Sequence, residues 1–229
     1  MKICVIGGNG EVGRFGRDFC DLARADGHEV YVLSHDGHMP TDPPLIPFDD
    51  KHVFAKFGNS SKVYVKAFND LLKDVDKLDI MLYNSNSWSY PSEIDQFQST
   101  SSFIENGWEH AIRIHAAIPH ALSLAALHKM DSTSKVVFVT SGLSFTLDRD
   151  YCTEEAGYAG CKGAQNQLMI ALAHHNDKGV TFTSFAPDFS YHNPKYYQET
   201  LGKVYNHVMT VGPEMNGKIV EINPTYDWL

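Results

Sequence analysis

Tyr158 and Lys162, a tyrosine and a lysine four residues apart, are by type and spacing the residues of this chain best suited to chemistry. On a helix, this spacing puts both side chains on one face, with Cβ atoms roughly 5–6 Å apart. A neighbouring ammonium favours the phenolate and lowers the pKa of the phenol from its usual value of about 10. The pair predicts proton transfer to or from an alcohol or carbonyl. Taken alone, the same spacing also fits a solvated lysine beside a half-buried tyrosine.

A serine at the end of a predicted strand supplies a hydroxyl for the substrate oxygen. The apolar run 136–139 leads into Thr140 and Ser141, and Ser144 follows three residues later. We favour Ser141 as the catalytic serine because it ends the strand. Ser144 stays open as the alternative.

The first residues of the chain read as strand, glycine turn and helix, which is the context that a dinucleotide-binding fingerprint requires. An apolar run over 2–6 precedes the turn, and an amphipathic helical pattern follows it. Gly8, Gly10 and Gly13 satisfy G-x-G-x-x-G, whose glycines allow a tight turn and close approach of the backbone to a pyrophosphate. The helix N-terminus then presents its N–H groups to the phosphates. The cofactor-binding residues predicted in this segment are Gly7, Gly8, Asn9, Gly10, Glu11, Val12, Gly13 and Arg14.

With both ends of the chain considered, the sequence resembles the short-chain dehydrogenase/reductase family over nearly its whole length. Residues 79–86 are similar to the family's D-I-L-V-N-N-A-G segment, and residues 108–117 to its central W-x-x-x-x-x-V-N helix. Tyr158 and Lys162 match its Y-x-x-x-K motif, and residues 185–188 resemble its A-P-G turn. The order and spacing of these matches carry the resemblance.

The resemblance implies an NAD(P)-dependent oxidoreductase that moves hydride between nicotinamide and a secondary alcohol or ketone. Tyr158 would be the proton donor or acceptor, Lys162 would bind the ribose hydroxyls and lower the tyrosine pKa, and Ser141 would hydrogen-bond the carbonyl oxygen. The further cofactor-binding residues that it implies are Asn84, Ser85 and Pro187.

Three departures from the family pattern leave other functions open. His115 stands where the family has an asparagine that supports a proton-relaying water, and we assign it either to that relay or to helix packing. Asp188 replaces the glycine of the A-P-G turn, and 223–225 replaces a final D-G-G. The alternative is therefore an NAD(P)-binding regulator with weak or lost catalysis. A sugar epimerase or dehydratase fits the glycine spacing, but 229 residues leave no room for its substrate domain.

The choice between NADP and NAD is predicted to depend on the residues after the second strand, expected over 29–33. There a carboxylate binds the ribose 2′-hydroxyl of NAD, whereas cationic or hydroxyl side chains accept the 2′-phosphate of NADP. No acid occupies the first position past the expected strand, and Arg14, Ser34 and His35 together could receive a phosphate. The sequence favours NADP, although Asp36 lies close enough to favour NAD.

Strands and helices are expected to alternate along one domain, residues 1–229. This pattern predicts an α/β fold, a doubly wound, Rossmann-like parallel sheet of about seven strands with helices on both faces. The expected strands are 2–6, 29–33, 62–66, 79–83, 135–140, 180–186 and 218–222. The expected helices are 12–26, 67–76, 104–129, 157–177 and 196–209. Ligands of such folds bind beyond the carboxyl ends of the strands.

Charge and composition narrow the partners. A net charge of −9 argues against general affinity for nucleic acid or anionic membranes. No run approaches the roughly 18 apolar residues of a membrane span, and the four cysteines show no C-x-x-C spacing, so a cytoplasmic protein with reduced thiols is expected. His110, His115 and His120 fall on different helix faces, which predicts no metal site.

Two further features concern the substrate and the assembly. The segment 190–210 is expected to form a lid over a small-molecule alcohol or carbonyl substrate. Its aromatic residues are Tyr191, Tyr196, Tyr197 and Tyr205. Small and apolar residues on the predicted helices 104–129 and 157–177 favour a homodimer or homotetramer, because in the family these helices pack across a two-fold axis.

Overall fold

Seven parallel strands form one central sheet in the computed structural model, which describes residues 1–7, 15–35, 51–55, 60–84, 111–144, 156–187 and 194–222. Their order across the sheet is β3-β2-β1-β4-β5-β6-β7, and every neighbouring pair is parallel. The strands are β1 (Lys2–Ile6), β2 (Glu29–His35), β3 (His52–Ala55), β4 (Ile80–Tyr83), β5 (Lys135–Val139), β6 (Thr181–Pro187) and β7 (Ile219–Ile222). The expected doubly wound parallel sheet is confirmed.

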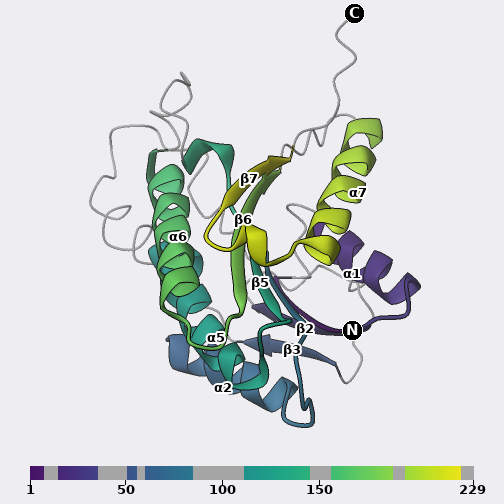
Figure 1. The fold of residues 1–229 in the computed structure, drawn as a ribbon, viewed down its shortest axis with the longest axis vertical. Coiled ribbons are helices and arrows are strands. Elements are labelled where there is room, and N and C mark those ends of the chain that lie inside the picture. The colour runs from purple at the N-terminus through teal and green to yellow at the C-terminus, as the bar shows by residue number, and fades with distance from the viewer. Residues whose placement is uncertain are drawn as a thin grey trace, which may run out of the picture.

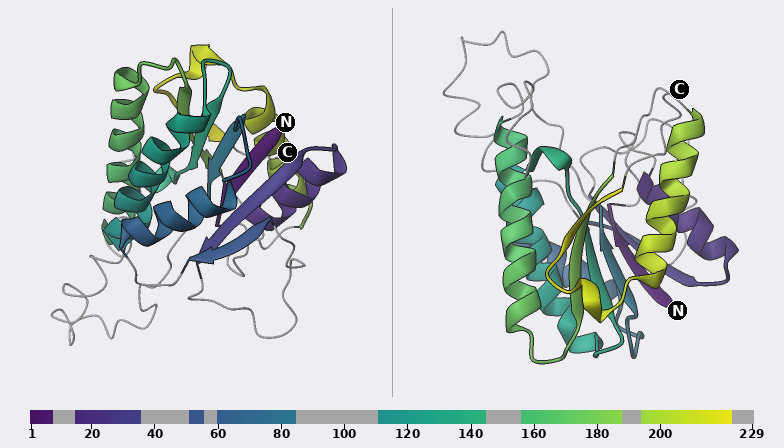
Figure 2. Two further views of the ribbon diagram at one scale, coloured as in Figure 1. Left: turned by 90° about the horizontal axis from the view of Figure 1, so that it is seen from below. Right: turned by 45° about the horizontal axis from the view of Figure 1, so that its top comes forward.

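Helices cover both faces of this sheet and give the molecule three layers (Figures 1 and 2). One face carries α2 (Ser61–Leu71), α5 (Ile118–Ala126) and α6 (Ala156–His175). The other carries α1 (Phe15–Ala25) and α7 (Pro194–Thr210). Short helical turns complete the described chain: η3 (Arg113–Ala117), η4 (Leu127–Lys129), η5 (Gly142–Ser144) and η7 (Pro213–Met215).

The apolar strands contribute side chains to two separate cores, because successive side chains of a strand point to opposite faces of the sheet. In β5, Val136 and Phe138 pack into the core under α2, α5 and α6. The intervening Val137 belongs to the core under α1 and α7. This alternation within an almost uninterrupted apolar run explains why the sheet is buried on both sides.

One part of the predicted element order is wrong. The segment expected as a strand over 62–66 lies in helix α2, and the third strand is β3, where no element was predicted. Valine and tyrosine favour strands in isolation. Here Tyr64 and Phe68, one helical turn apart, are both buried against the sheet. The helix expected over 67–76 therefore starts earlier and ends at Leu71.

The remaining predicted elements are found with small shifts in their ends. The long central helix expected over 104–129 is described from residue 111 onwards. It consists of a short helical run, the π-helical turn η3, α5 and the 3₁₀ turn η4. Residues 104–110 of that prediction lie outside the described residues.

Helix α7 occupies most of the segment expected as a substrate lid, and two of its tyrosines bond to aspartates of the α1 region. Tyr197 is buried and donates a hydrogen bond to the Asp18 carboxylate at 2.7 Å. Tyr205 donates to Asp26 at 2.6 Å. Both tyrosines therefore join α7 to α1, because Asp18 lies in α1 and Asp26 directly follows it. The hydroxyls of these two tyrosines are thus bonded to aspartates, the lid over a substrate stays a prediction, and Tyr191 lies outside the described residues.

Candidate functional site

The carboxyl ends of four neighbouring strands bring together residues that are far apart in the sequence. Gly7 follows β1, Asn84 follows β4, Ser141 follows β5 by two residues, and Pro187 ends β6. From β1, the chain adds β2 and β3 on one side of the sheet and then β4 on the other side. The order of the strands therefore reverses between β1 and β4. Ligands of open α/β sheets bind at such a switch point.

The turn after β1 is held in place by its neighbours. Gly7 has a φ of +85°, a conformation that side-chain-bearing residues rarely adopt. Its amide donates to the Leu33 carbonyl at 2.8 Å, and its carbonyl accepts from the Asn84 side-chain amide at 3.0 Å. Asn84 thus supports the start of the glycine turn. The predicted cofactor residues Gly8, Asn9, Gly10, Glu11, Val12, Gly13 and Arg14, and likewise Ser85, lie outside the described residues.

Tyr158 and Lys162 lie on the inner face of α6, one turn apart. Their exposed fractions are only 7% and 2%. The Lys162 ammonium nitrogen is 5.8 Å from the centroid of the Tyr158 ring and donates to the Val139 carbonyl at 2.8 Å. The lysine is therefore anchored to the last residue of β5, two residues before Ser141.

Burial sets the charge of this lysine. Removal from water disfavours an ammonium group and lowers the pKa of Lys162 to about 7. Among the described residues, the one other oxygen bonded to the Lys162 nitrogen is that of the Gln165 side chain, at 3.5 Å. Near neutral pH, an ammonium at this position is therefore less favoured than it is in water.

His115 contacts the tyrosine from the neighbouring helix. The imidazole is fully buried, and its ring meets the Tyr158 ring edge-on at 83°, with centroids 5.6 Å apart. His115 lies in η3, where the helix widens by one residue and the Tyr83 hydroxyl donates to the Ile114 carbonyl. The contact from Tyr83 was not predicted, because no local pattern signals a π-helical turn or its distant partner.

The hydroxyl of Ser144, the second candidate serine, is already hydrogen-bonded within the protein. The Ser144 hydroxyl donates to the Ser141 carbonyl at 2.6 Å and accepts from the Asn166 side-chain amide at 2.8 Å. Its single proton is therefore already used within the protein. Ser141 is half-buried where β5 ends. Ser141 stays preferred because it follows the end of β5, and the choice between the two serines remains a prediction.

The second strand extends further than predicted. Both Ser34, whose side chain is buried, and His35 belong to β2, where they pair with Phe54 and Ala55. The next residue in sequence is the acidic Asp36, which lies outside the described residues together with Arg14. The preference for NADP assumed a strand end at Leu33, so this longer strand removes its main support and leaves NADP and NAD both open.

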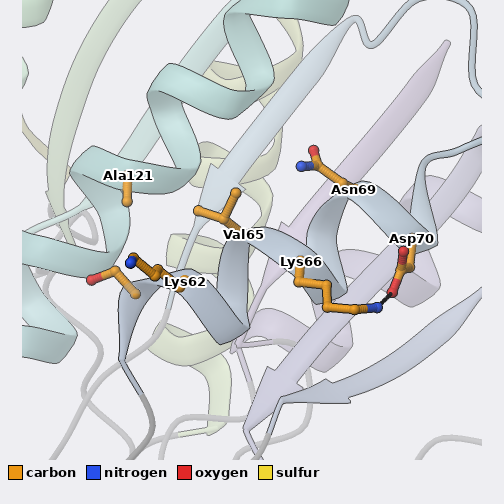
Figure 3. Close-up of a pocket in the computed structure, with 7 residues that line it drawn as sticks. Lys62, Val65, Lys66, Asn69, Asp70 and Ala121 are labelled. Atoms are coloured by element: carbon orange, nitrogen blue, oxygen red, sulfur yellow. Dashed lines mark hydrogen bonds and ion pairs between the residues drawn. The ribbon is translucent and has the colours of Figure 1, made fainter.

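Other features of the described residues lie away from this edge. A groove of about 500 Å³ between α2 and α5 contains none of the proposed catalytic residues, and an ion pair joins Lys66 to Asp70 along it (Figure 3). No group of three or more His, Cys, Asp or Glu residues in the described segments could hold a metal ion. None of the described helices combines the length and apolarity needed to traverse a bilayer.

No family model matches the sequence, and no curated protein matches it. Solved structures do. A short-chain dehydrogenase/reductase family oxidoreductase from Brucella ovis, solved with a partially ordered NAD, matches with a TM-score of 0.71 and 15% identity, over 97% of this chain and 99% of that chain. BdcA, solved with NADPH, matches with a TM-score of 0.67 and 16% identity, over 98% and 93%. A short-chain dehydrogenase/reductase from Saccharomyces cerevisiae matches with a TM-score of 0.67 and 16% identity, over 98% and 96%.

The chain has the short-chain dehydrogenase/reductase fold. The match extends over nearly the whole chain, as expected from the order of the sequence motifs. At 15–16% identity it concerns the fold alone. On that fold, Lys162 is hydrogen-bonded to the last residue of β5, Ser141 follows that strand, and β4 separates β5 from β1, the strand that leads to Gly7. The roles of these residues remain predictions.

Proposed function

We propose that this protein is an NAD(P)-dependent oxidoreductase that interconverts a secondary alcohol and a ketone. The single observation that carries the proposal is the buried pair on α6. Lys162 lies 5.8 Å from the Tyr158 ring and is hydrogen-bonded to the end of the strand that leads to Ser141. The fold adds support, since structures of the same fold were solved with NADPH or NAD.

The described part of the cofactor site fits a dinucleotide. The positive φ of Gly7 and its hydrogen bonds to Leu33 and Asn84 hold the residue that begins the proposed glycine turn at the switch point. Lys162 would bind the ribose hydroxyls, while Asn84 and Pro187 would line the nicotinamide half. When bound, the nicotinamide supplies or accepts the hydride. The glycine-rich residues 8–14 and Ser85 complete the proposed site from the sequence.

The protein's own groups move and hold the proton. Tyr158 would give its phenolic proton to the carbonyl oxygen during reduction and take it back during oxidation. Protonated Lys162 would lower the pKa of that phenol through its positive charge. Ser141 would hydrogen-bond the substrate oxygen and hold it near the phenol. His115, buried against the Tyr158 ring, would pass protons between this site and its surroundings.

The second candidate function is a dinucleotide-binding regulator with weak catalysis. The observation that favours it is the burial of Lys162, which lowers the pKa of its ammonium to about 7 and so reduces the charge available to activate Tyr158. A regulator would bind dinucleotide saturably without turning over substrates. The retention of Ser141, Tyr158 and Lys162 together favours the oxidoreductase.

A binding measurement combined with an activity screen separates these functions. Titrating the protein with NADPH and NADH gives both dissociation constants, and a panel of ketones and aldehydes is then tested for loss of absorbance of the reduced cofactor. We expect turnover that Tyr158→Phe abolishes while its dinucleotide affinity stays within about twofold. Equal turnover in Tyr158→Phe would contradict the oxidoreductase. Tight dinucleotide binding with no turnover of any carbonyl would favour the regulator.

The outer faces of α5 and α6 support the proposed homodimer. Leu124 on α5 is 46% exposed and borders a hollow that α5 and α6 share. A second copy would bury this apolar face. Light scattering should report a dimer or tetramer, and Leu124→Glu should reduce it to a monomer. Leu22→Glu, at a comparably exposed position on α1, is the matched control and should leave assembly unchanged. A monomeric wild-type protein would exclude the proposal.

A further inference from the structure

Two side chains of helix α6 donate hydrogen bonds to the segment around the end of β5, one on each side of Ser141. Lys162 donates to the Val139 carbonyl at 2.8 Å. One turn further along α6, the Asn166 side-chain amide donates to the Ser144 hydroxyl at 2.8 Å. The first contact belongs to the proposed catalytic lysine. The second involves two residues to which the proposed mechanism gives no role.

Ser144 transmits the Asn166 contact to Ser141. With the Asn166 amide as donor, the Ser144 hydroxyl turns its own proton to the Ser141 carbonyl, at 2.6 Å. The Ser144 backbone amide donates to the same carbonyl at 3.0 Å. The Ser141 carbonyl thus receives two hydrogen bonds, and both come from Ser144. The Thr140 hydroxyl, 3.3 Å from the Ser144 hydroxyl, is a further and more distant partner. The shorter bond from Asn166 directs the Ser144 proton to the Ser141 carbonyl and so constrains the peptide that carries the Ser141 side chain.

If Asn166 served packing alone, its buried polar side chain would lower the stability of the fold. Its side chain is 3% exposed, and its amide oxygen accepts no hydrogen bond from the described residues. A buried acceptor without a partner opposes folding, whereas leucine has nearly the same volume and no such atom. The contribution of Asn166 therefore lies in directing the Ser144 hydroxyl. Polar groups that break a packing rule are expected where a site has to be oriented.

We propose that Asn166 and Ser144 are positioning residues that fix Ser141 for the reaction. The proposal rests on the oxidoreductase function proposed above. Ser141 must place its hydroxyl within hydrogen-bond distance of the substrate oxygen while Tyr158 meets the same oxygen. Loss of either bond from Asn166 or Ser144 frees the 141–144 turn to rotate. Displacements of about 1 Å in a catalytic group reduce turnover by up to about 100-fold.

Kinetics of four variants and one matched control test this chain of contacts. Ser144→Ala and Asn166→Leu should each lower kcat by on the order of 10- to 100-fold, with the KM for dinucleotide within about twofold. The double variant should be no worse than the poorer single variant, because both act through one path. Ser144→Thr keeps the hydroxyl and should restore most of kcat. Ser123→Ala removes a buried hydroxyl from α5 and is the matched control, with kcat unchanged.

Amide hydrogen exchange gives a readout that does not depend on turnover. Asn166→Leu should accelerate exchange at the Ser144 amide at least tenfold while the amides of β5 keep their protection. Should Asn166→Leu fail to fold, Ser144→Ala, at a half-buried turn position, carries the kinetic test. Unchanged kcat in Ser144→Ala overturns the proposal, as does additive loss in the double variant. If the wild-type protein turns over no carbonyl, the proposed function fails separately, and unchanged Ser144 exchange in Asn166→Leu then overturns the positioning role.

Discussion

The imidazole of His115 meets the phenol ring of Tyr158 edge-on, with the ring centroids 5.6 Å apart. This contact joins the π-helical turn η3 to helix α6 at the centre of the proposed site. It fixes one side of the Tyr158 ring, while the Lys162 ammonium lies on another, 5.8 Å from the centroid.

Replacing the imidazole by a phenyl ring separates packing from proton transfer. His115→Phe keeps an aromatic edge against Tyr158 and removes both ring nitrogens. We expect the melting temperature to change by only a few degrees and kcat to fall on the order of tenfold, since the proton relay is lost. His115→Leu controls for the aromatic contact. Full turnover in His115→Phe would assign His115 to packing alone.

The buried lysine predicts a specific pH dependence of stability. Its pKa is about 7 in the folded protein and about 10.5 when exposed on unfolding. Between these values the unfolded chain binds the extra proton, so this group makes the protein more stable as pH rises from 7 to 10.5. Below that window the buried ammonium costs stability in full.

Urea unfolding of the wild type and Lys162→Met measures this effect. The methionine variant should be more stable at about pH 6, by on the order of a few kcal/mol. Its advantage should shrink steadily towards about pH 10. A difference that does not depend on pH would contradict the depressed pKa. Other titrating groups cancel because they are present in both proteins.

The contact between α1 and α7 should depend on two tyrosine hydroxyls of unequal burial. Tyr197→Phe removes the bond to Asp18 from a buried site and should cost about 1 kcal/mol of unfolding free energy. Tyr205→Phe removes an exposed bond to Asp26 and should cost less than about 0.5 kcal/mol. Chemical denaturation measures both. Equal effects would show that burial does not set the strength of these bonds.

Helix α2 offers a direct test of the corrected element. Val63 is 36% exposed and stands in the segment that sequence patterns favour as a strand. In a helix, Val63→Ala should stabilise the protein by about 0.5 kcal/mol, whereas in a strand it should destabilise it. Phe68→Ala, on the buried face of α2, should cost about 3–5 kcal/mol. Thermal or urea unfolding distinguishes these signs.

Local patterns in the sequence predicted most of the architecture. The apolar runs of β1, β4, β5 and β6 are long enough to identify strands, and their alternation with helices requires a parallel sheet. The spacing of Tyr158 and Lys162 predicted a shared helix face. Tyr64 and Phe68 show where this reasoning failed. Tyr64 and its valine neighbours favour a strand in the short window 62–66, whereas the burial of Tyr64 together with Phe68, one turn later, is that of a helix packed on the sheet.

The sequence by itself determined most of the order of the elements, apart from β3 and the start of α2, and the types of residue that reach the carboxyl edge of the sheet. Only the tertiary structure decided how those residues are held. The depressed pKa of Lys162 follows from burial by the whole fold, and Asn166 reaches Ser144 across 22 positions. Tyr197 and Tyr205 each reach an aspartate 179 positions away. Helix and strand patterns reflect neighbours along the chain, whereas these contacts depend on packing between elements that no local pattern encodes.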